Sequence, residues 1–252
     1  MRKILLLAMA ALMFPGCGKD TPGPVGPQGP QGAGSNGFQQ TFEWGLYPDT
    51  TYQGSQCHYV DGGNPNSAPS TGEIRVGTGI STGSVQLGLI RFDLSGYVPV
   101  NTTLTGAILE LTTETTSTLS PGSFEFGVHQ VTPPPAGQVP WNMGSTWNVV
   151  VPPFGWEGGS SSPIAAGVDY SNSPADAVTL TNTQVNGKEV PVGWSIPAAL
   201  AWVWVDPRND NYGILISPEP EISAALSGSI QFWDNTGNAQ ECPRLVIKYT
   251  IP

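Results

Sequence analysis

Residues 85–92 read Val85-Gln86-Leu87-Gly88-Leu89-Ile90-Arg91-Phe92, and this stretch decides the fold class. Successive side chains of a β-strand point to opposite faces of the sheet. One face of this strand therefore carries valine, two leucines and arginine, and the other includes isoleucine and phenylalanine. Apolar side chains on both faces predict a strand that lies centrally in a packed β-domain.

Similar short runs, separated by turn-forming residues, continue on both sides of this strand. They predict strands at 51–59, 73–76, 85–93, 104–112, 124–131, 178–181, 190–194, 212–217, 229–233 and 245–250. The segment 197–205 predicts one short helix, because it opens with a proline and is rich in Ala and Leu. We therefore expect an all-β fold, an antiparallel β-sandwich (jelly roll) with one short helix near 197–205. The aromatic-rich stretch between Thr132 and Asp176 is expected to be ordered and folded over an end of the sandwich.

The composition agrees with this fold class and excludes some partners. Charged residues make up 11% of the chain, which also has 32 Gly and 25 Pro, a balance typical of short strands joined by turns. Without Arg2 and Lys3, seven basic residues face 19 acidic ones, a net charge of −12. Because the few Lys and Arg form no patch, nucleic acid and anionic lipid headgroups are poor partners.

The N-terminal residues have the pattern of an export signal. Arg2 and Lys3 precede an apolar run at 4–13, which is too short for a permanent membrane span. The following Phe14-Pro15-Gly16-Cys17 resembles the lipobox of bacterial lipoproteins, in which the cysteine is diacylated. This resemblance implies cleavage after residue 16 and a membrane partner reached through lipid on Cys17. The alternative is an ordinary signal peptide with an unrelated cysteine.

A glycine and not an aspartate follows Cys17. By analogy with the sorting rule of enteric bacteria, this favours the outer membrane and a surface-exposed location in the cell envelope. The next segment, 23–34, has Gly at every third position and Pro after it three times, which is the collagen repeat. Four triplets favour an extended stalk, and the alternative is a short trimerising stem. The expected organisation is a signal peptide at 1–16, a lipid-anchored stalk at 17–37 and a β-domain at 38–252.

Two cysteines remain beyond the anchor, Cys57 and Cys242. Outside the cytoplasm an even pair predicts a disulfide, and the first and last strands of a jelly roll commonly neighbour each other. The alternative is a metal pair that includes His58.

Six sequence blocks occur in the order found in the disaggregatase-related (DNRLRE) domains, and the resemblance runs from about residue 49 to residue 249. The blocks are Gln86–Ser95, Gly106–Leu111, Phe126–Val131, Trp141 with Ser145-Thr146-Trp147-Asn148, Trp202 with Asn211–Ile216, and Pro243–Tyr249. The resemblance implies a β-jelly-roll domain of a kind appended to extracellular enzymes and surface proteins. Some members of that family are carbohydrate-binding modules with a preference for acidic polysaccharide.

Exposed aromatic rings are the strongest functional indication in the sequence. Sugar rings stack their C–H faces on Trp and Tyr, while polar neighbours bind the hydroxyl groups. The aromatic residues that match the family, Trp141, Trp147 and Trp202, are expected to be structural. The remaining ligand-binding candidates are Trp156, Tyr170, Trp194, Trp204 and Trp233. An acidic glycan would need Arg75, Arg91, Lys188 or Arg208 in the binding groove.

No cofactor is certain, and a structural calcium ion is a weaker expectation. Hard cations bind several oxygen ligands, and two turns rich in oxygen contain Asp61 and Asn64, and Asp206 and Asn211. Solvated turns explain both equally well. Catalysis finds little support, because the chain has two His, no Gly-x-Ser-x-Gly and no His-Glu-x-x-His.

The sequence thus predicts a surface-anchored, non-catalytic module that binds extracellular polysaccharide or another surface glycan, or serves in adhesion. The first alternative is a structural protein that self-associates as a homo-oligomer, a trimer or a fibre subunit. A glycan-degrading enzyme is the second, and it would need a pair of carboxylates about 5 to 9.5 Å apart in a cleft.

Overall fold

The structure, a computed structural model, describes residues 37–69, 72–78, 84–99, 101–133, 140–151, 154–156, 163–206, 210–219, 227–236 and 240–251. The expected signal peptide, the anchor at Cys17 and the collagen-like repeat lie outside these residues. None of the helices in the described part is long and apolar enough to cross a membrane.

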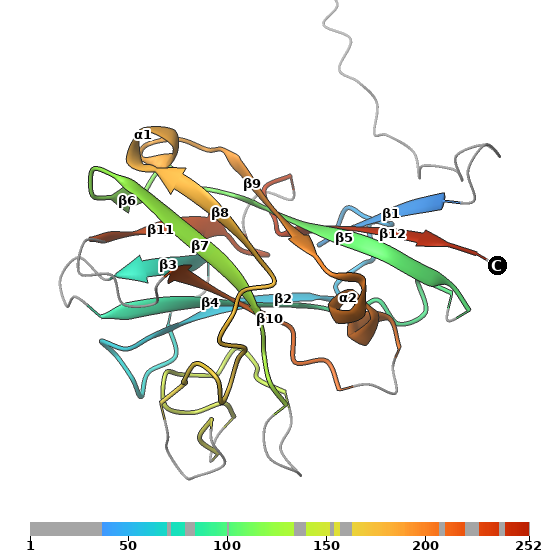
Figure 1. Ribbon diagram of the computed structural model, residues 1–252, viewed down its shortest axis with the longest axis horizontal. Coiled ribbons are helices and arrows are strands. Elements are labelled where there is room, and N and C mark those ends of the chain that lie inside the picture. The colour runs from blue at the N-terminus through green and yellow to red at the C-terminus, as the bar shows by residue number, and fades with distance from the viewer. Residues whose placement is uncertain are drawn as a thin grey trace, which may run out of the picture.

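Two antiparallel sheets face each other (Figure 1). The smaller sheet has the strand order β1 (Gly37–Glu43), β12 (Arg244–Thr250), β5 (Thr103–Thr112) and β9 (Pro191–Ile196). The larger sheet has the order β6 (Thr118–Leu119), β11 (Gly228–Trp233), β3 (Glu73–Thr78), β4 (Val85–Phe92), β10 (Ile214–Glu219), β7 (Ser123–Gln130) and β8 (Asp176–Thr181). Its eighth strand, β2 (Ser55–Asp61), pairs with β4 along its whole length.

Eight of these strands have jelly-roll connectivity. Taken in chain order, β1, β4, β5, β7, β8, β9, β10 and β12 are arranged 1-8-3-6 in the smaller sheet and 2-7-4-5 in the larger one. The first and last strands, β1 and β12, pair over seven residues. The expected all-β antiparallel sandwich is therefore confirmed, and β2, β3, β6 and β11 extend the larger sheet beyond the jelly roll.

The main core fills the space between the two sheets. From Ala107 to Thr112, buried residues of β5 alternate with partly exposed ones, and Leu109 and Leu111 are part of this core. Trp194 of β9 crosses the core, where its indole N–H donates to the Phe126 carbonyl of β7 at 2.9 Å. The two sheets are thus joined by a hydrogen bond as well as by apolar packing.

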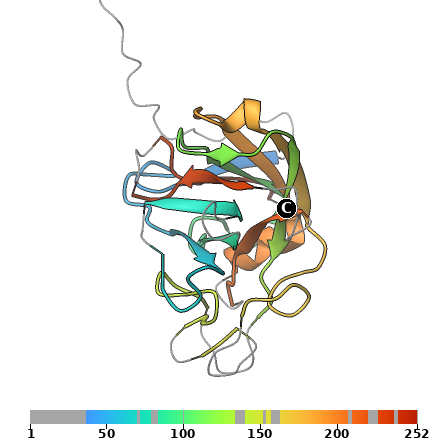
Figure 2. The same cartoon turned by 90° about the vertical axis from the view of Figure 1, so that its left-hand side faces the viewer.

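A second core lies on the outer face of the larger sheet. Leu87 and Leu89 of β4 are fully buried there, with Leu215 of β10, beneath the segment that follows β7. That segment, drawn in yellow-green to yellow, lies below β2, β4 and β10 in Figure 1 and again below the sandwich in Figure 2. It contributes Trp141 and Trp156 to this core. The apolar residues on both faces of β4 are explained because both faces are covered.

Two helices accompany the sheets. The expected helix is present as α2 (Ala198–Val205), with Pro197 at its N-cap and Asp206 at its C-cap. It contacts both sheets, since it packs on β5 and its Trp204 ring lies 6.0 Å from that of Phe92 in β4. The other helix, α1 (Asn182–Val185), was not predicted, although Thr181 and Gln184 form a capping box at its start.

Strand β1 was also not predicted. The structure has no bridge between Cys57 and Cys242, and both are buried thiols. Cys57 lies in β2, where it pairs with Ile90, and Cys242 lies just before β12. The two residues are close enough for Cys242 to contribute to the raised pKa of Cys57. Burial raises the pKa of Cys57 well above its usual value and that of Cys242 to about 11.

Candidate functional site

Four of the five aromatic residues expected to stack on sugar are buried, which corrects that prediction. Trp194 has no exposed surface, and Tyr170, Trp204 and Trp156 are 1 to 3% exposed. Trp233 of β11 is half-buried opposite Glu73 of β3. Trp194 and Trp204 belong to the main core, and Trp156 and Tyr170 belong to the second core on the outer face of the larger sheet. An exposed aromatic platform therefore cannot be built from this set.

The indole N–H groups separate the buried tryptophans into two kinds. Those of Trp141 and Trp156 donate to the carbonyls of Tyr212 at 2.7 Å and Thr146 at 2.9 Å, as Trp194 does to Phe126. The N–H of Trp204 is buried without any hydrogen-bond acceptor, and so is that of the half-buried Trp233. A buried donor that lacks a partner is uncommon and costs about 1–3 kcal/mol.

A cleft of about 310 Å³ lies beside Trp204, between the end of α2 and the ends of β2 and β4. We call it the α2 cleft. Its walls contain both hydrogen-bond donors and hydrogen-bond acceptors. The lining residues are Gly54, Gln56, Arg91, Asp93, Ser95, Pro140, Val203, Trp204, Asp206 and Asn211. Its volume is at the small end of the range of roughly 300–1,000 Å³ for ligand pockets.

Arg91 supplies the positive charge of the α2 cleft. Its Nε and Nη2 donate to Gln56 Oε1 at 3.0 and 2.6 Å, and its guanidinium lies 5.2 Å from the ring centre of Trp141. Burial lowers the pKa of Arg91, and the charge of Asp93 opposes that effect. The guanidinium is thus fixed in orientation by its neighbours.

The other polar residues of the α2 cleft are held by local bonds. Asp93 Oδ1 accepts hydrogen bonds from the backbone N–H and the hydroxyl of Ser95 at 3.0 and 2.6 Å. Asn211 donates to the Phe92 carbonyl at 2.6 Å and accepts from the N–H of Gly213. Asp206 is buried at the end of α2. Arg91, Asp93, Asp206 and Asn211 therefore present fixed donors and acceptors to one cleft.

The two turns expected to be able to bind calcium lie at opposite ends of β4. Asp206 and Asn211 lie at the Phe92 end of β4, whereas Asp61 is paired with Gln86 at its other end. Asp61 accepts from the N–H of Gly63 at 2.8 Å and from Gln86 Nε2 at 3.2 Å, and Asn64 is exposed. Within the described ranges, no three His, Cys, Asp or Glu side chains gather into a set that could hold a metal ion.

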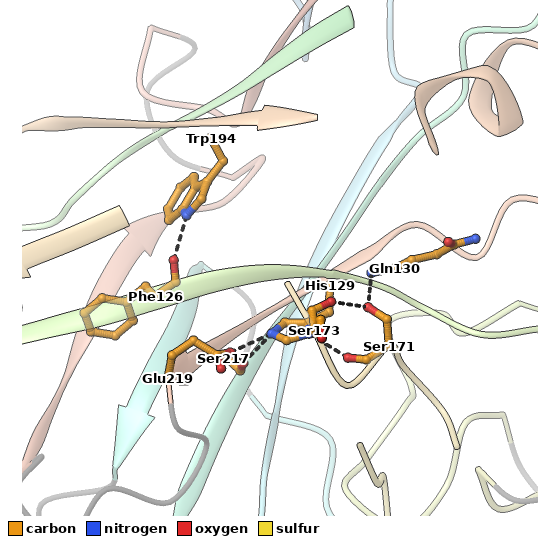
Figure 3. A network of polar contacts seen from close by, with 8 residues as sticks. All are labelled: Phe126, His129, Gln130, Ser171, Ser173, Trp194, Ser217 and Glu219. Carbon is orange, nitrogen blue, oxygen red and sulfur yellow. Dashed lines mark hydrogen bonds and ion pairs between the residues drawn. The ribbon is translucent and has the colours of Figure 1, made fainter. Parts of the chain in front are cut away.

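His129 of β7 contacts both a serine and a carboxylate, but the arrangement differs from that of a hydrolase (Figure 3). Its Nε2 lies 2.6 Å from Glu219 Oε1 and 3.1 Å from Ser217 Oγ, and its Nδ1 lies 2.7 Å from the Ser171 carbonyl. In a catalytic triad the acid and the nucleophile bind opposite nitrogens of the imidazole. Here they share one nitrogen, and His129 and Ser217 are buried. This cluster ties β7 and β10 to the covering segment.

A separate groove of about 310 Å³ crosses the outer face of the smaller sheet. Thr41, Val246 and Ile108 line it from three adjacent strands, between the exposed cations Arg244 and Lys248. We call it the outer groove. In the next row across these strands stands Glu43, a buried carboxyl aligned with Arg244 and Glu110. Burial, with a contribution from Glu110, raises the pKa of Glu43 to about 7, although the charge of Arg244 opposes the shift.

The sequence analysis identified several residues of the α2 cleft as candidates but did not predict that they lie together. Trp204, Asp206 and Asn211 were all candidates, but for two different roles, and Arg91 was considered as a groove residue. Gln56 was missed. Its position opposite Arg91 in the β2–β4 pair follows from the register of the two strands, which the sequence alone does not specify.

Comparison with known proteins adds no assignment. No protein-family model matches the chain, and no curated protein matches it. The similarity of the six sequence blocks to the disaggregatase-related domains therefore stays a prediction.

Proposed function

We propose that this protein is a lipid-anchored, non-catalytic surface module that binds extracellular polysaccharide through the α2 cleft. The observation that carries the proposal is the mixed polar lining of this cleft, in which Arg91, Asp93 and Asn211 are each fixed by local hydrogen bonds. Sugar hydroxyls are both donors and acceptors, and binding sites of this kind combine a few fixed polar groups with apolar walls.

The charges of the α2 cleft favour a neutral sugar. Arg91 is its one cation among the described lining residues, and Asp93 and Asp206 are two carboxylates. An acidic polysaccharide would meet both carboxylates close to the arginine that attracts it. This is a departure from the preference that the resemblance to the disaggregatase-related domains implies.

The test is affinity electrophoresis of the full chain, in detergent, through gels containing a panel of neutral and acidic polysaccharides. Wild-type protein is expected to be retarded by at least one neutral polysaccharide, and Asp93→Asn and Arg91→Gln are expected to weaken binding about tenfold or more. Arg244→Gln is the matched control, since it removes an equal charge from the outer groove. No retardation by any polysaccharide, or equal retardation of all variants, would refute the proposal.

The lipid anchor is tested separately, because it rests on the sequence around Cys17 alone. Wild-type protein expressed in a bacterial host should incorporate labelled palmitate and partition into detergent. Cys17→Ser should do neither and should be released as a soluble protein. Labelling that persists in Cys17→Ser would contradict the anchor. Fractionation of the host membranes distinguishes the outer membrane, where the protein is expected, from the inner one.

Self-association is a second candidate function, and strand β1 is the observation that favours it. This strand forms one edge of the smaller sheet and contains neither Lys nor Pro, the residues that commonly protect edge strands from pairing. Analytical ultracentrifugation of the full chain decides the matter. A mass of one chain at all concentrations would exclude it, whereas a trimer or larger assembly that a Thr41→Pro substitution dissociates would support it.

A further inference from the structure

The wall of the α2 cleft separates it from a second cleft of different character. This neighbouring cleft has a volume of about 290 Å³, and Val203 and Trp204 line both clefts. We call it the apolar cleft, because most of its remaining lining is apolar: Val131, Pro133, Leu200 and Tyr212, with Gln130, Asp210 and Gly213 beside them. The two clefts thus meet at one tryptophan, with polar groups concentrated on one side of it.

The shared wall contains one of the buried donors that lack an acceptor. Trp204 is 2% exposed, and its indole N–H lies beneath the wall surface. The other three fully buried indoles of the sandwich and its cover all donate to backbone carbonyls. A carbonyl oxygen is therefore the acceptor that this protein itself supplies to such groups. At Trp204 a ligand could supply it, after a small movement of the ring.

We infer that the ligand is a neutral sugar that carries an acyl group, such as an N-acetyl or O-acetyl substituent; this inference rests on the proposed function of the α2 cleft. The sugar hydroxyls bind Arg91 and Asp93 in the α2 cleft. The acyl carbonyl accepts the N–H of Trp204, and the acyl methyl enters the apolar cleft beside Leu200 and Val203. An unsubstituted sugar offers neither the carbonyl nor the methyl group, so it leaves the apolar cleft unused.

The experiment compares ligands that differ in the acyl group alone. Binding of the full chain to the tetrasaccharide of β-1,4-linked N-acetylglucosamine is measured by calorimetry against cellotetraose, which has the same linkage without acetamido groups. O-acetylated xylan is compared with the same xylan after alkaline deacetylation. We expect at least tenfold tighter binding of the acylated member in one of the two pairs, and the pair that responds distinguishes an N-acyl from an O-acyl source.

Trp204→Phe removes the N–H and keeps an aromatic ring in the wall. It is expected to lower the affinity for the acylated ligand to that of the unsubstituted one. Trp202→Phe is the matched control, since Trp202 is half-buried on the same helix and lines neither cleft. Should Trp204→Phe fail to fold, the assigned indole ¹H–¹⁵N resonance of Trp204 in the wild-type protein provides the readout. It should move downfield with the acylated ligand and not with the unsubstituted one.

Two negative outcomes have different meanings. Equal affinity for the acylated and unsubstituted members of both pairs overturns the acyl inference and leaves the polysaccharide-binding proposal in place. Binding of no saccharide in either pair, and none in the electrophoretic panel, overturns both.

Discussion

The outer faces of the two sheets differ, although the sheets share one core. The segment after β7 covers the outer face of the larger sheet around β2, β4 and β10, so Leu87 and Leu89 are as inaccessible as the residues between the sheets. The outer face of the smaller sheet bears the outer groove with exposed Arg244 and Lys248. The strand sequences reflect this difference, because β4 has apolar residues on both faces, whereas buried and partly exposed residues alternate in most of β5. A strand's pattern thus reports how many of its faces are covered.

The largest expected effect comes from removing apolar volume on the covered face. Leu89→Ala should lower the free energy of unfolding by about 2–5 kcal/mol, because the side chain is fully buried beneath the covering segment. Ile108→Ala, on the outer groove, should cost less than about 1 kcal/mol because Ile108 is half-buried. Urea unfolding followed by tryptophan fluorescence measures both. Equal losses would mean that the two faces are equally buried in solution.

The buried carboxyl at the margin of the outer groove makes stability depend on pH. Glu43 has a folded pKa of about 7 against an ordinary value of 4.5, so the folded state holds the proton more tightly than the unfolded state does. Stability should therefore fall as pH rises from 4.5 to 7, by roughly 3 kcal/mol, and then level off. Glu43→Gln should remove this part of the pH dependence and should be more stable than wild type at pH 8. Superimposable stability profiles of the two proteins between pH 4 and 8 would contradict this.

Glycines on the two outer faces should respond differently to a methyl group. A Cβ at Gly127, under the cover, would lie 2.8 Å from Glu219 Oε1 and 3.0 Å from His129 Nε2. Gly127→Ala should therefore disturb the contact between these two residues and cost about 1–3 kcal/mol. At Gly193 of β9 the nearest atom would be 3.7 Å away, so Gly193→Ala should change stability by less than about 0.5 kcal/mol. Thermal melts of both variants measure these changes, and equal losses of stability in the two variants would contradict the prediction.

The smallest effect is expected for the ion pair of the outer groove. Arg244 Nε donates to Glu110 Oε2 at 2.6 Å, and both side chains are substantially exposed. Glu110→Gln should change stability by about 0–1 kcal/mol, and any loss should vanish in high salt. A loss of several kcal/mol would indicate that this face is covered in solution.

Much of the fold could be predicted from local pattern, and the exceptions have physical causes. All ten predicted strands and the helix are present, because each has alternating or continuous apolar residues and clear turn signals at its ends. Strand β1 was missed because its sequence, with Phe38 and Phe42 separated by polar residues, directly follows a Gly-rich stretch of the sequence.

The candidate site could be predicted less well than the fold. Tryptophans were expected to be exposed because the sequence does not reveal that the larger sheet is covered on both faces. The α2 cleft brings together Gln56, Arg91 and Trp204 from two strands and a helix, and their proximity depends on register and on helix packing. Whether the N–H of Trp204 finds an acceptor likewise depends on the residues packed around it in the fold, which no local sequence pattern specifies.

The position of β12 in the smaller sheet affects how this chain acquires its fold. Strand β12 (Arg244–Thr250) lies between β1 and β5 and pairs with both. These two strands therefore cannot join one sheet until residues 244–250 have been synthesised. Pairing the first strand with the last closes a long loop, which is slow and comes late in folding. The smaller sheet can therefore be completed only once residues 244–250 are available to join β1 to β5.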